Sequence, residues 1–246
     1  MGYHESLTEG RNAVLEAFRS GKTVDRLFVL DGCQDGPVKT ILREAKKQDT
    51  MVQYVKKERL DQLSETKNHQ GVIAYCAACE YAEVSDILEN AKKKGEAPFI
   101  VLLDGIEDPH NLGAIIRTAN QAGAHGVISP KRRAVGLTAT VARTSAGAVN
   151  YTPVAKVTNL VTVMEDLKKE GMWFVCADMD GEEMYSLNLK GPIGLVIGNE
   201  GEGVSRLVKE HCDMVASIPM KGDIDSLNAS VAMGVLAYEI VRQRRF

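Results

Sequence analysis

FIVLLDGIEDPHNLGAIIRTANQAG, residues 99–123, is the stretch of the sequence that decides the fold. The run FIVLLDGI at its start is apolar on both faces, which is typical of a central strand in a parallel sheet. A helix is predicted to follow over Leu112–Gln121, and the alternation continues through the strands GVIS, WFVCAD, IGLVIG and MVASI. Helices are predicted between them over Leu137–Ala146, over Leu160–Lys169 and from Val204. We therefore predict an α/β fold with a mainly parallel sheet over residues 98–246.

The residues before this stretch form a second, smaller alternation of helices and strands. Helical patterns at RNAVLEAFRSG, GPVKTILREAKKQD and KKERLDQLS alternate with the strand patterns VDRLFVL, MVQYV and GVIAYCA. They predict a small α/β domain over residues 1–78. A charged helical connector, residues 79–97, separates it from the larger domain.

The composition limits the class of protein. Hydrophobic residues make up 44% of the chain and charged residues 26%, which is ordinary for a globular protein. No apolar run approaches the ~18 residues that cross a bilayer, and no signal peptide is visible, so we expect a cytoplasmic protein that does not enter the membrane. The net charge of −3 does not by itself indicate a nucleic-acid binder. Basic clusters such as RQRR, residues 242–245, are typical of a solvated face.

The five cysteines predict neither a disulfide framework nor a metal centre. Their number is odd and their spacing irregular, which favours reduced thiols. Cys76 and Cys79 form a close pair, but a zinc site would need a second pair or histidines at ligand spacing. We expect no bound metal.

Three loops carry polar side chains that packing does not explain. Ligands of parallel sheets bind beyond the carboxyl ends of the strands, and three such ends are followed by EDPHNLG, NEGEGV and PMKGDIDSLNAS. Asn111 in the first loop has an alternative role as a helix cap. Arg117 suits a bidentate partner such as phosphate. Together the loops favour positioning a substrate over activating a strong nucleophile, since they hold no Ser-His-Asp triad, metal cluster or paired carboxylates.

The final helix has more polar residues at its start than a cap requires. Asp225 or Ser226 is predicted to cap it, and Asn228 and Ser230 follow within the next turn. Its apolar residues form two stripes, which are explained either by packing within the chain or by a dimer. The first stripe consists of Ala229, Met233, Leu236 and Ile240, and the second of Val231, Val235 and Tyr238.

These loops resemble, in order and spacing, the three motifs of the TrmH/SpoU family of RNA ribose 2′-O-methyltransferases in the SPOUT superfamily. The segments DPHNLGAIIRTANQAGAHGVI, LVIGNEGEGV and IPMKGDIDSLNASVA carry the resemblance. EGRNAV and NHQGVIA in the first third resemble the L30e-like RNA-binding domain that precedes the catalytic domain in many members. The resemblance implies an α/β methyltransferase domain with a trefoil knot, preceded by a small L30e-like domain.

The resemblance also implies a reaction. The two-domain layout is most similar to bacterial enzymes that methylate a guanosine of 23S rRNA at its ribose 2′-oxygen, with S-adenosylmethionine as methyl donor. A tRNA ribose methyltransferase and a noncatalytic RNA-binding factor for ribosome assembly are the alternatives. Family members are homodimers whose site combines loops of both subunits.

Residue by residue, the resemblance implies three sets of functional residues. The catalytic set is Asn111, Arg117, Glu200, Ser226 and Asn228. The donor would be bound, largely through backbone groups, by Ala177, Gly198, Ile218, Met220 and Leu227. RNA contacts are expected from Arg11, Asn12, His69, Lys131, Arg132 and Arg133, although the last three are also typical of a solvated loop.

Overall fold

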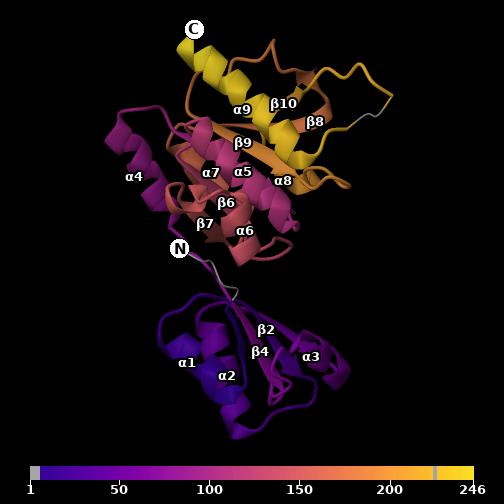
Figure 1. Cartoon of the computed structure of the whole chain (residues 1–246). Coiled ribbons are helices and arrows are strands. Elements are labelled where there is room, and N and C mark those ends of the chain that lie inside the picture. The colour runs from indigo at the N-terminus through magenta and orange to yellow at the C-terminus, as the bar shows by residue number, and fades with distance from the viewer. Residues whose placement is uncertain (1–5, 224–225) are drawn as a thin grey trace. The chain divides into compact units, whose positions relative to one another are not determined.

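The computed structural model describes residues 6–223 and 226–246, and the chain divides into two compact units. The first unit runs to Glu80 and includes Gly136–Thr140. The second comprises Tyr81–Val135 and Val141–Phe246. Figure 1 shows the elements of each unit in the colours of their sequence position.

The first unit is a four-stranded sheet with helices on both faces. Its strands β1 (Ser6–Glu9), β2 (Val24–Leu30), β3 (Met51–Val55) and β4 (Val72–Cys76) lie in the order β1-β4-β2-β3. Only β2 and β3 are parallel. Leu27 and Val29 pack in the cluster that contains α1 (Arg11–Arg19) and α2 (Gly36–Lys47), whereas Phe28 packs with α3 (Lys57–Leu63). The sequence patterns predicted all of these elements except the short strand β1.

The second unit is built on a six-stranded sheet in which every neighbouring pair is parallel, as predicted. The strand order is β10-β8-β9-β5-β6-β7. The strands are β5 (Phe99–Asp104), β6 (Gly126–Pro130), β7 (Val154–Val157), β8 (Trp173–Glu183), β9 (Ile193–Gly198) and β10 (Met214–Ser217). Because all strands run in one direction, their carboxyl ends share one edge of the sheet.

Helices cover both faces of this sheet. The helices α4 (Val84–Lys94), α7 (Leu160–Lys169) and α8 (Arg206–Glu210) pack into one core cluster with Ile100, Leu102 and Phe174. The opposite face carries α5 (Pro109–Gln121) and α9 (Ala229–Arg245), which lie side by side (Figure 1). The connector predicted over residues 79–97 therefore contains a helix, α4, that packs into the second unit.

Several elements differ in length from their predictions, and α5 begins three residues before the predicted Leu112. The helix predicted over Leu137–Ala146 is shorter, α6 (Ala139–Thr144), and a 3₁₀ turn, η1 (Ala148–Asn150), follows it. Strand β8 continues five residues beyond the predicted WFVCAD, and its pairing with β10 shifts register between Val215 and Ala216. A Cβ atom at Gly181 would lie 2.4 Å from the Val215 carbonyl oxygen, so glycine permits this extension. The trefoil knot depends on how the chain threads rather than on strand order, and it stays a prediction.

Candidate active site

Asn111 lies in the first turn of α5 and does not cap the helix. The Asp108 carboxylate accepts a hydrogen bond from the His110 backbone N–H at 3.0 Å, and Pro109 occupies the first helical position. The interpretation of Asn111 as a helix cap is therefore wrong. Its side chain is buried, with 8% relative exposure, and its amide needs other partners.

The loop after β9 is a tight turn that only glycine permits. Asn199 and Gly203 exchange backbone hydrogen bonds of 3.0 and 2.8 Å. A Cβ atom at Gly198 would lie 2.1 Å from the Gly203 carbonyl carbon, closer than any real contact. The Asn199 amide donates to the Gly105 carbonyl at 2.9 Å and accepts from the Gly201 N–H at 2.8 Å. Asn199 thus joins the loops after β9 and β5, a role that the sequence did not indicate.

The loop after β10 ends in the cap of α9. The cap is Asn228, whose Oδ1 accepts hydrogen bonds from the Ser230 backbone N–H at 2.9 Å and from Ser230 Oγ at 2.6 Å. The prediction that Ser226 caps this helix is wrong, and Asp225, the other predicted cap, lies outside the described residues. The amide nitrogen of Asn228 points to the other two loops.

One side chain from each loop joins a single hydrogen-bonded group, which we call the amide–carboxylate cluster: Asn111, Glu200 and Asn228. Asn111 Nδ2 donates to Glu200 Oε1 at 2.8 Å. Asn228 Nδ2 donates to Asn111 Oδ1 at 3.0 Å and also to Glu200 Oε1. These partners are 89 and 117 residues apart in the sequence. The structure therefore brings the three loops together at one edge of the sheet.

The remaining two members of the predicted catalytic set lie outside the cluster. Arg117 is exposed on α5, about 120° around the helix from Asn111. Within residues 6–223 and 226–246, no hydrogen bond or ion pair holds its guanidinium. Ser226 is exposed and lines the pocket described next.

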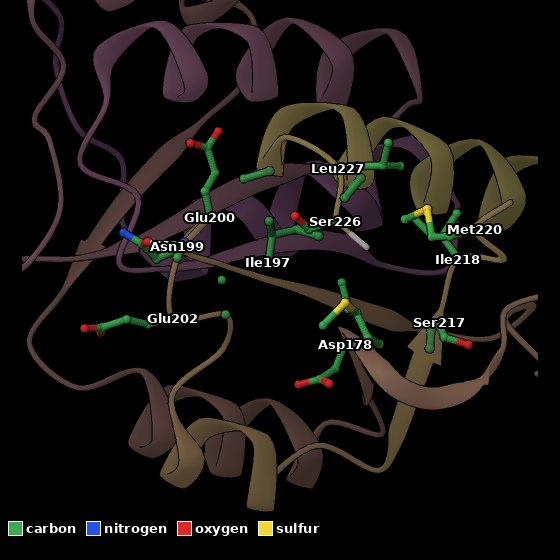
Figure 2. Close-up of a pocket in the computed structure, with 18 of the residues that line it drawn as sticks. Asp178, Ile197, Asn199, Glu200, Glu202, Ser217, Ile218, Met220, Ser226 and Leu227 are labelled. Carbon is green, nitrogen blue, oxygen red and sulfur yellow. Dashed lines mark hydrogen bonds between the residues drawn. The ribbon is translucent and has the colours of Figure 1, made fainter. Parts of the chain in front are cut away.

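A pocket of about 690 Å³ adjoins the cluster at the carboxyl ends of β8, β9 and β10. Figure 2 shows Asn199, Glu200 and Glu202 on one side of it and Ile218 and Met220 on the other. Its volume is within the ~300–1,000 Å³ of typical small-molecule sites. All five residues predicted to bind a methyl donor line it, together with Glu200 and Ser226: Ala177, Gly198, Ile218, Met220 and Leu227.

Acidic side chains surround this pocket, and of these only Glu200 is predicted to be functional from the sequence. Asp178, Glu183, Glu200 and Glu202 all line it. Burial acts to raise the pKa of Asp178, but hydrogen bonds from Lys209 and the Asp180 backbone outweigh it and hold the pKa below its usual range. The Lys209 ammonium lies 2.8 Å from the carboxylate. A pocket with this lining suits a ligand that carries positive charge.

The predicted RNA contacts of the first unit are placed in different environments. The Arg11 guanidinium lies 2.6 Å from Asp35 and donates to the Gln70 carbonyl at 3.1 Å. His69 is buried at 6% exposure, and its Nδ1 accepts from the Gly71 N–H at 3.0 Å. Both side chains thus serve internal contacts. Asn12 instead lines a second pocket, of about 560 Å³.

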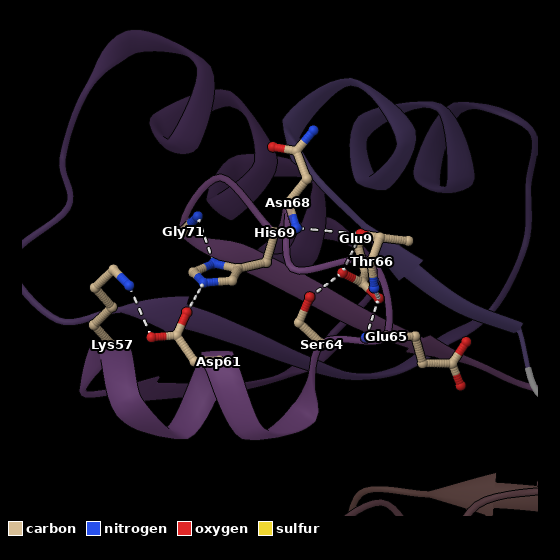
Figure 3. A network of polar contacts seen from close by, with 9 residues as sticks. All are labelled: Glu9, Lys57, Asp61, Ser64, Glu65, Thr66, Asn68, His69 and Gly71. Carbon is tan, nitrogen blue, oxygen red and sulfur yellow. Dashed lines mark hydrogen bonds and ion pairs between the residues drawn. The ribbon is translucent and has the colours of Figure 1, made fainter.

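The loop that contains His69 is held by two carboxylates. Figure 3 shows Asp61 between His69 and Lys57, with the imidazole Nε2 3.0 Å from Asp61. Glu9 accepts hydrogen bonds from the Glu65 backbone at 2.7 Å and from the Thr66 hydroxyl at 2.8 Å, and it also bonds to Ser64. Glu9 at the end of β1 thus fixes the rim of the second pocket, a role that the sequence did not indicate.

The two basic clusters of the second unit differ. Lys131, Arg132 and Arg133 follow β6 at the same edge of the sheet as the amide–carboxylate cluster, and both arginines are exposed. In RQRR, however, Arg244 is partly buried. Its guanidinium donates to three backbone carbonyls at 2.7–3.0 Å, and burial lowers its pKa. Arg244 therefore fixes the end of α9, which corrects the expectation for this cluster.

The described residues contain neither a candidate metal site nor a helix that could cross a membrane. Among residues 6–223 and 226–246, no group of three or more histidine, cysteine, aspartate or glutamate side chains is arranged to hold a metal ion. None of the helices there combines the length and hydropathy that crossing a bilayer requires.

Comparisons with known proteins agree on one family. Residues 98–238 match the model of the SpoU rRNA Methylase family, and residues 7–82 match the model "RNA 2'-O ribose methyltransferase substrate binding". A Bacillus subtilis (strain 168) protein named "Putative TrmH family tRNA/rRNA methyltransferase YacO" is 48% identical over 96% of this chain and 94% of its own length.

Two solved structures have similar folds. The AdoMet-bound rRNA methyltransferase from Sinorhizobium meliloti aligns with 96% of this chain and 86% of its own at a TM-score of 0.60 and 26% identity. The A. aeolicus TrmH/SpoU tRNA modifying enzyme aligns with 65% of this chain and 84% of its own at a TM-score of 0.55 and 27% identity. Since the first family model covers more than half of the residues, the chain belongs to the TrmH/SpoU family of RNA methyltransferases.

Proposed function

We propose that this protein transfers a methyl group from S-adenosylmethionine to the ribose 2′-hydroxyl of a guanosine in 23S rRNA. One observation carries the proposal: the pocket lined by the five predicted donor-binding residues shares Glu200 with the amide–carboxylate cluster. A site for the donor and a site for a polar acceptor group are therefore neighbours, as group transfer requires.

The residues present fit S-adenosylmethionine. At Gly198 the missing side chain leaves the backbone accessible, and a Cβ there would collide with the turn that closes the pocket. The four carboxylates of the lining complement a sulfonium cation. Ala177, Gly198, Ile218, Met220 and Leu227 would hold the molecule. The group supplies an activated methyl, so the protein has mainly to bind and orient both partners.

We assign to Glu200 the role of accepting the proton of the ribose hydroxyl. Its Oε1 accepts both amides of the cluster, while Oε2 has no partner among the described residues. The two amides hold the carboxylate through Oε1 and leave Oε2 as the acceptor for the ribose hydroxyl. Glu200 therefore orients the hydroxyl first and takes its proton late, as positive charge develops on the oxygen during methyl transfer.

Arg117 has a different task, because a guanidinium is always protonated and cannot accept a proton. We assign it to a bidentate contact with the phosphate next to the methylated ribose. Replacing Arg117 with lysine is expected to preserve RNA affinity and to remove most turnover. Normal turnover of that variant contradicts the bidentate contact.

We assign Arg117 to the amide–carboxylate cluster of a second copy in a homodimer. The exposed face formed by α5 and α9 supports such a dimer. The first apolar stripe of α9 is buried in the chain, whereas Val231 and Tyr238 of the second stripe are 49% and 51% exposed. A Cβ at Gly234 would lie 3.4 Å from Thr118, next to Arg117, so the two helices form one surface. A second copy would cover this surface and complete the site.

A mixture of two inactive variants tests the shared site. If Arg117 of one subunit serves Glu200 of the other, mixed dimers of Arg117→Lys and Glu200→Gln subunits contain one intact site. An equimolar mixture then regains about a quarter of the wild-type turnover. No recovery in dimers that have exchanged subunits, checked by analytical ultracentrifugation and mass spectrometry, contradicts a shared site.

The first unit favours rRNA over tRNA as the substrate. The rRNA methyltransferase structure aligns with both units of this chain, but the tRNA modifying enzyme aligns with 65% of it. We expect RNA phosphates to contact the exposed Arg132 and Arg133, and Asn12 to contact RNA from the second pocket. Reversing both arginine charges should weaken binding and reduce the salt slope by roughly two. An unchanged slope places the RNA elsewhere.

Methyl transfer from labelled S-adenosylmethionine to 23S rRNA and to tRNA tests the proposal directly. We expect product on 23S rRNA, and mapping 2′-O-methyl groups in cells with and without the gene identifies the nucleotide. Product on tRNA alone supports the alternative substrate. RNA binding with no donor binding by calorimetry supports the noncatalytic assembly factor.

A further inference from the structure

We infer that Ser230 is a positioning residue: its hydroxyl holds the Asn228 amide in the orientation that directs the cluster's hydrogen bonds to Glu200. The inference rests on the proposed function, because it takes the amide–carboxylate cluster as the place of methyl transfer. It also accounts for Ser230, the polar residue at the start of α9 to which the resemblance assigns no role.

The direction of every hydrogen bond in the cluster follows from two groups whose roles are fixed, the Ser230 backbone N–H and the Glu200 carboxylate. The Ser230 backbone N–H can only donate, so the Asn228 atom 2.9 Å from it is the amide oxygen. The ionised Glu200 carboxylate can only accept, so both amides present their NH₂ groups to it. The 3.0 Å contact from Asn228 Nδ2 to Asn111 Oδ1 is the one arrangement that agrees with both ends.

Ser230 Oγ supplies a second hydrogen bond to the same acceptor, Asn228 Oδ1. It lies 2.6 Å from Asn228 Oδ1, a normal distance for a strong O–H···O bond. A carbonyl oxygen has two lone pairs, so the backbone N–H and the hydroxyl together saturate it. If the amide turned over, its NH₂ group would face the Ser230 backbone N–H, which cannot accept, and its oxygen would face the Glu200 carboxylate. The backbone N–H therefore selects the orientation that serves Glu200, and the hydroxyl adds a second hydrogen bond that restrains the amide in it.

Capping alone does not require this hydroxyl. The backbone N–H of Ser230 caps α9 through Asn228 whatever side chain the residue carries. Ser230 is the second residue of α9, and alanine has the highest intrinsic helix propensity of all residues. Removing the hydroxyl should therefore leave the stability of the fold unchanged or raised. The loss of the hydroxyl should instead lower the rate of methyl transfer.

The experiment compares Ser230→Ala and Ser230→Thr with the wild type, and Ser20→Ala serves as a matched control. Ser20 also donates its hydroxyl to a neighbouring acceptor at a helix end, the Ala17 carbonyl at 3.1 Å. For each protein we would measure the single-turnover rate of methyl transfer, the affinity for S-adenosylmethionine, the melting temperature and the NMR signals of the Asn228 side-chain NH₂.

We expect Ser230→Ala to slow methyl transfer roughly 3- to 10-fold, the equivalent of one neutral hydrogen bond. Donor affinity should stay within about 2-fold and the melting temperature should not fall, since the cap remains. Its Asn228 NH₂ signals should shift, and Ser230→Thr, which keeps a hydroxyl, should restore both rate and signals. Ser20→Ala should behave as the wild type.

The inference is overturned if Ser230→Ala matches an active wild type in rate, or if its rate and melting temperature fall together without rescue by threonine. A wild type that transfers no methyl group contradicts the proposed function instead. In that case the NMR signals still decide whether Ser230 orients Asn228: unchanged signals overturn the inference, and shifted signals support it.

Discussion

Replacing Gly198 with alanine tests the tight turn that lines the pocket. The new methyl group would lie 2.1 Å from the Gly203 carbonyl carbon and 2.2 Å from both the Gly203 oxygen and the Val204 nitrogen. All three are backbone atoms, so no side chain can rotate away. The turn would have to move by about 1.3 Å to bring the nearest atom to an ordinary contact at 3.4 Å.

The size of the effect follows from that movement. Forcing a methyl group into a packed region costs about 1–3 kcal/mol. The retreat also strains the two backbone hydrogen bonds between Asn199 and Gly203, each of which contributes about 1 kcal/mol. Because this turn lines the pocket, we expect the affinity for S-adenosylmethionine to fall roughly 10- to 100-fold. The melting temperature should fall as well.

Calorimetric titration of S-adenosylmethionine measures the affinity, and Gly191→Ala is the matched control. Gly191 precedes the same strand, and a Cβ there would meet no atom within 4 Å. The control should bind and melt as the wild type does. If Gly198→Ala binds the donor within about 3-fold of the wild type, the steric reasoning is refuted.

Three further predictions concern the amide–carboxylate cluster and two buried contacts of the second unit. Glu200→Gln should lower the methyl transfer rate roughly 100-fold, because an NH₂ group that can only donate replaces the oxygen that accepts the proton; single-turnover kinetics check this. Burial lowers the pKa of His125, whose Nδ1 accepts from the Phe99 N–H. As the pH falls, the unfolded chain therefore protonates this histidine at a higher pH than the folded chain does. The contribution of His125 to the free energy of unfolding should be constant above about pH 7 and should fall below pH 6.5 by up to about 1.4 kcal/mol per pH unit. Urea titrations should show this slope reduced in His125→Asn. Arg244→Met should lower the stability by about 2–4 kcal/mol in the same assay, against less than about 0.5 for the exposed Arg206→Met.

The convergence of the three loops was predictable because it follows from topology. FIVLLDGI and IGLVIG are apolar on both faces, and parallel strands place their carboxyl ends at one edge. The loops that leave β5, β9 and β10 must therefore begin near one another. The resemblance supplied the residues within them, and the pocket contains all five assigned to the donor.

The partners of individual polar groups were not predictable, because they depend on residues far apart in the sequence. Arg11 is held by a carbonyl 59 positions away, and Asn199 by one 94 positions away. Local patterns also fail where several cap residues compete. DPHN and DSLN each offer more than one residue able to cap a helix, and the structure uses Asp108 in the first and Asn228 in the second.

The use of asparagine at the start of α9 joins the helix cap to the chemistry of the site. Serine, threonine, aspartate and asparagine all cap helices, because each offers an oxygen to the free N–H groups. An aspartate at position 228 would accept the Ser230 hydrogen bonds equally well but would place a second negative charge against Glu200. A serine or threonine has one hydroxyl proton and is too short to reach both Asn111 and Glu200. Asparagine alone accepts on one side and donates two protons on the other, so the same amide that starts the helix also closes the amide–carboxylate cluster.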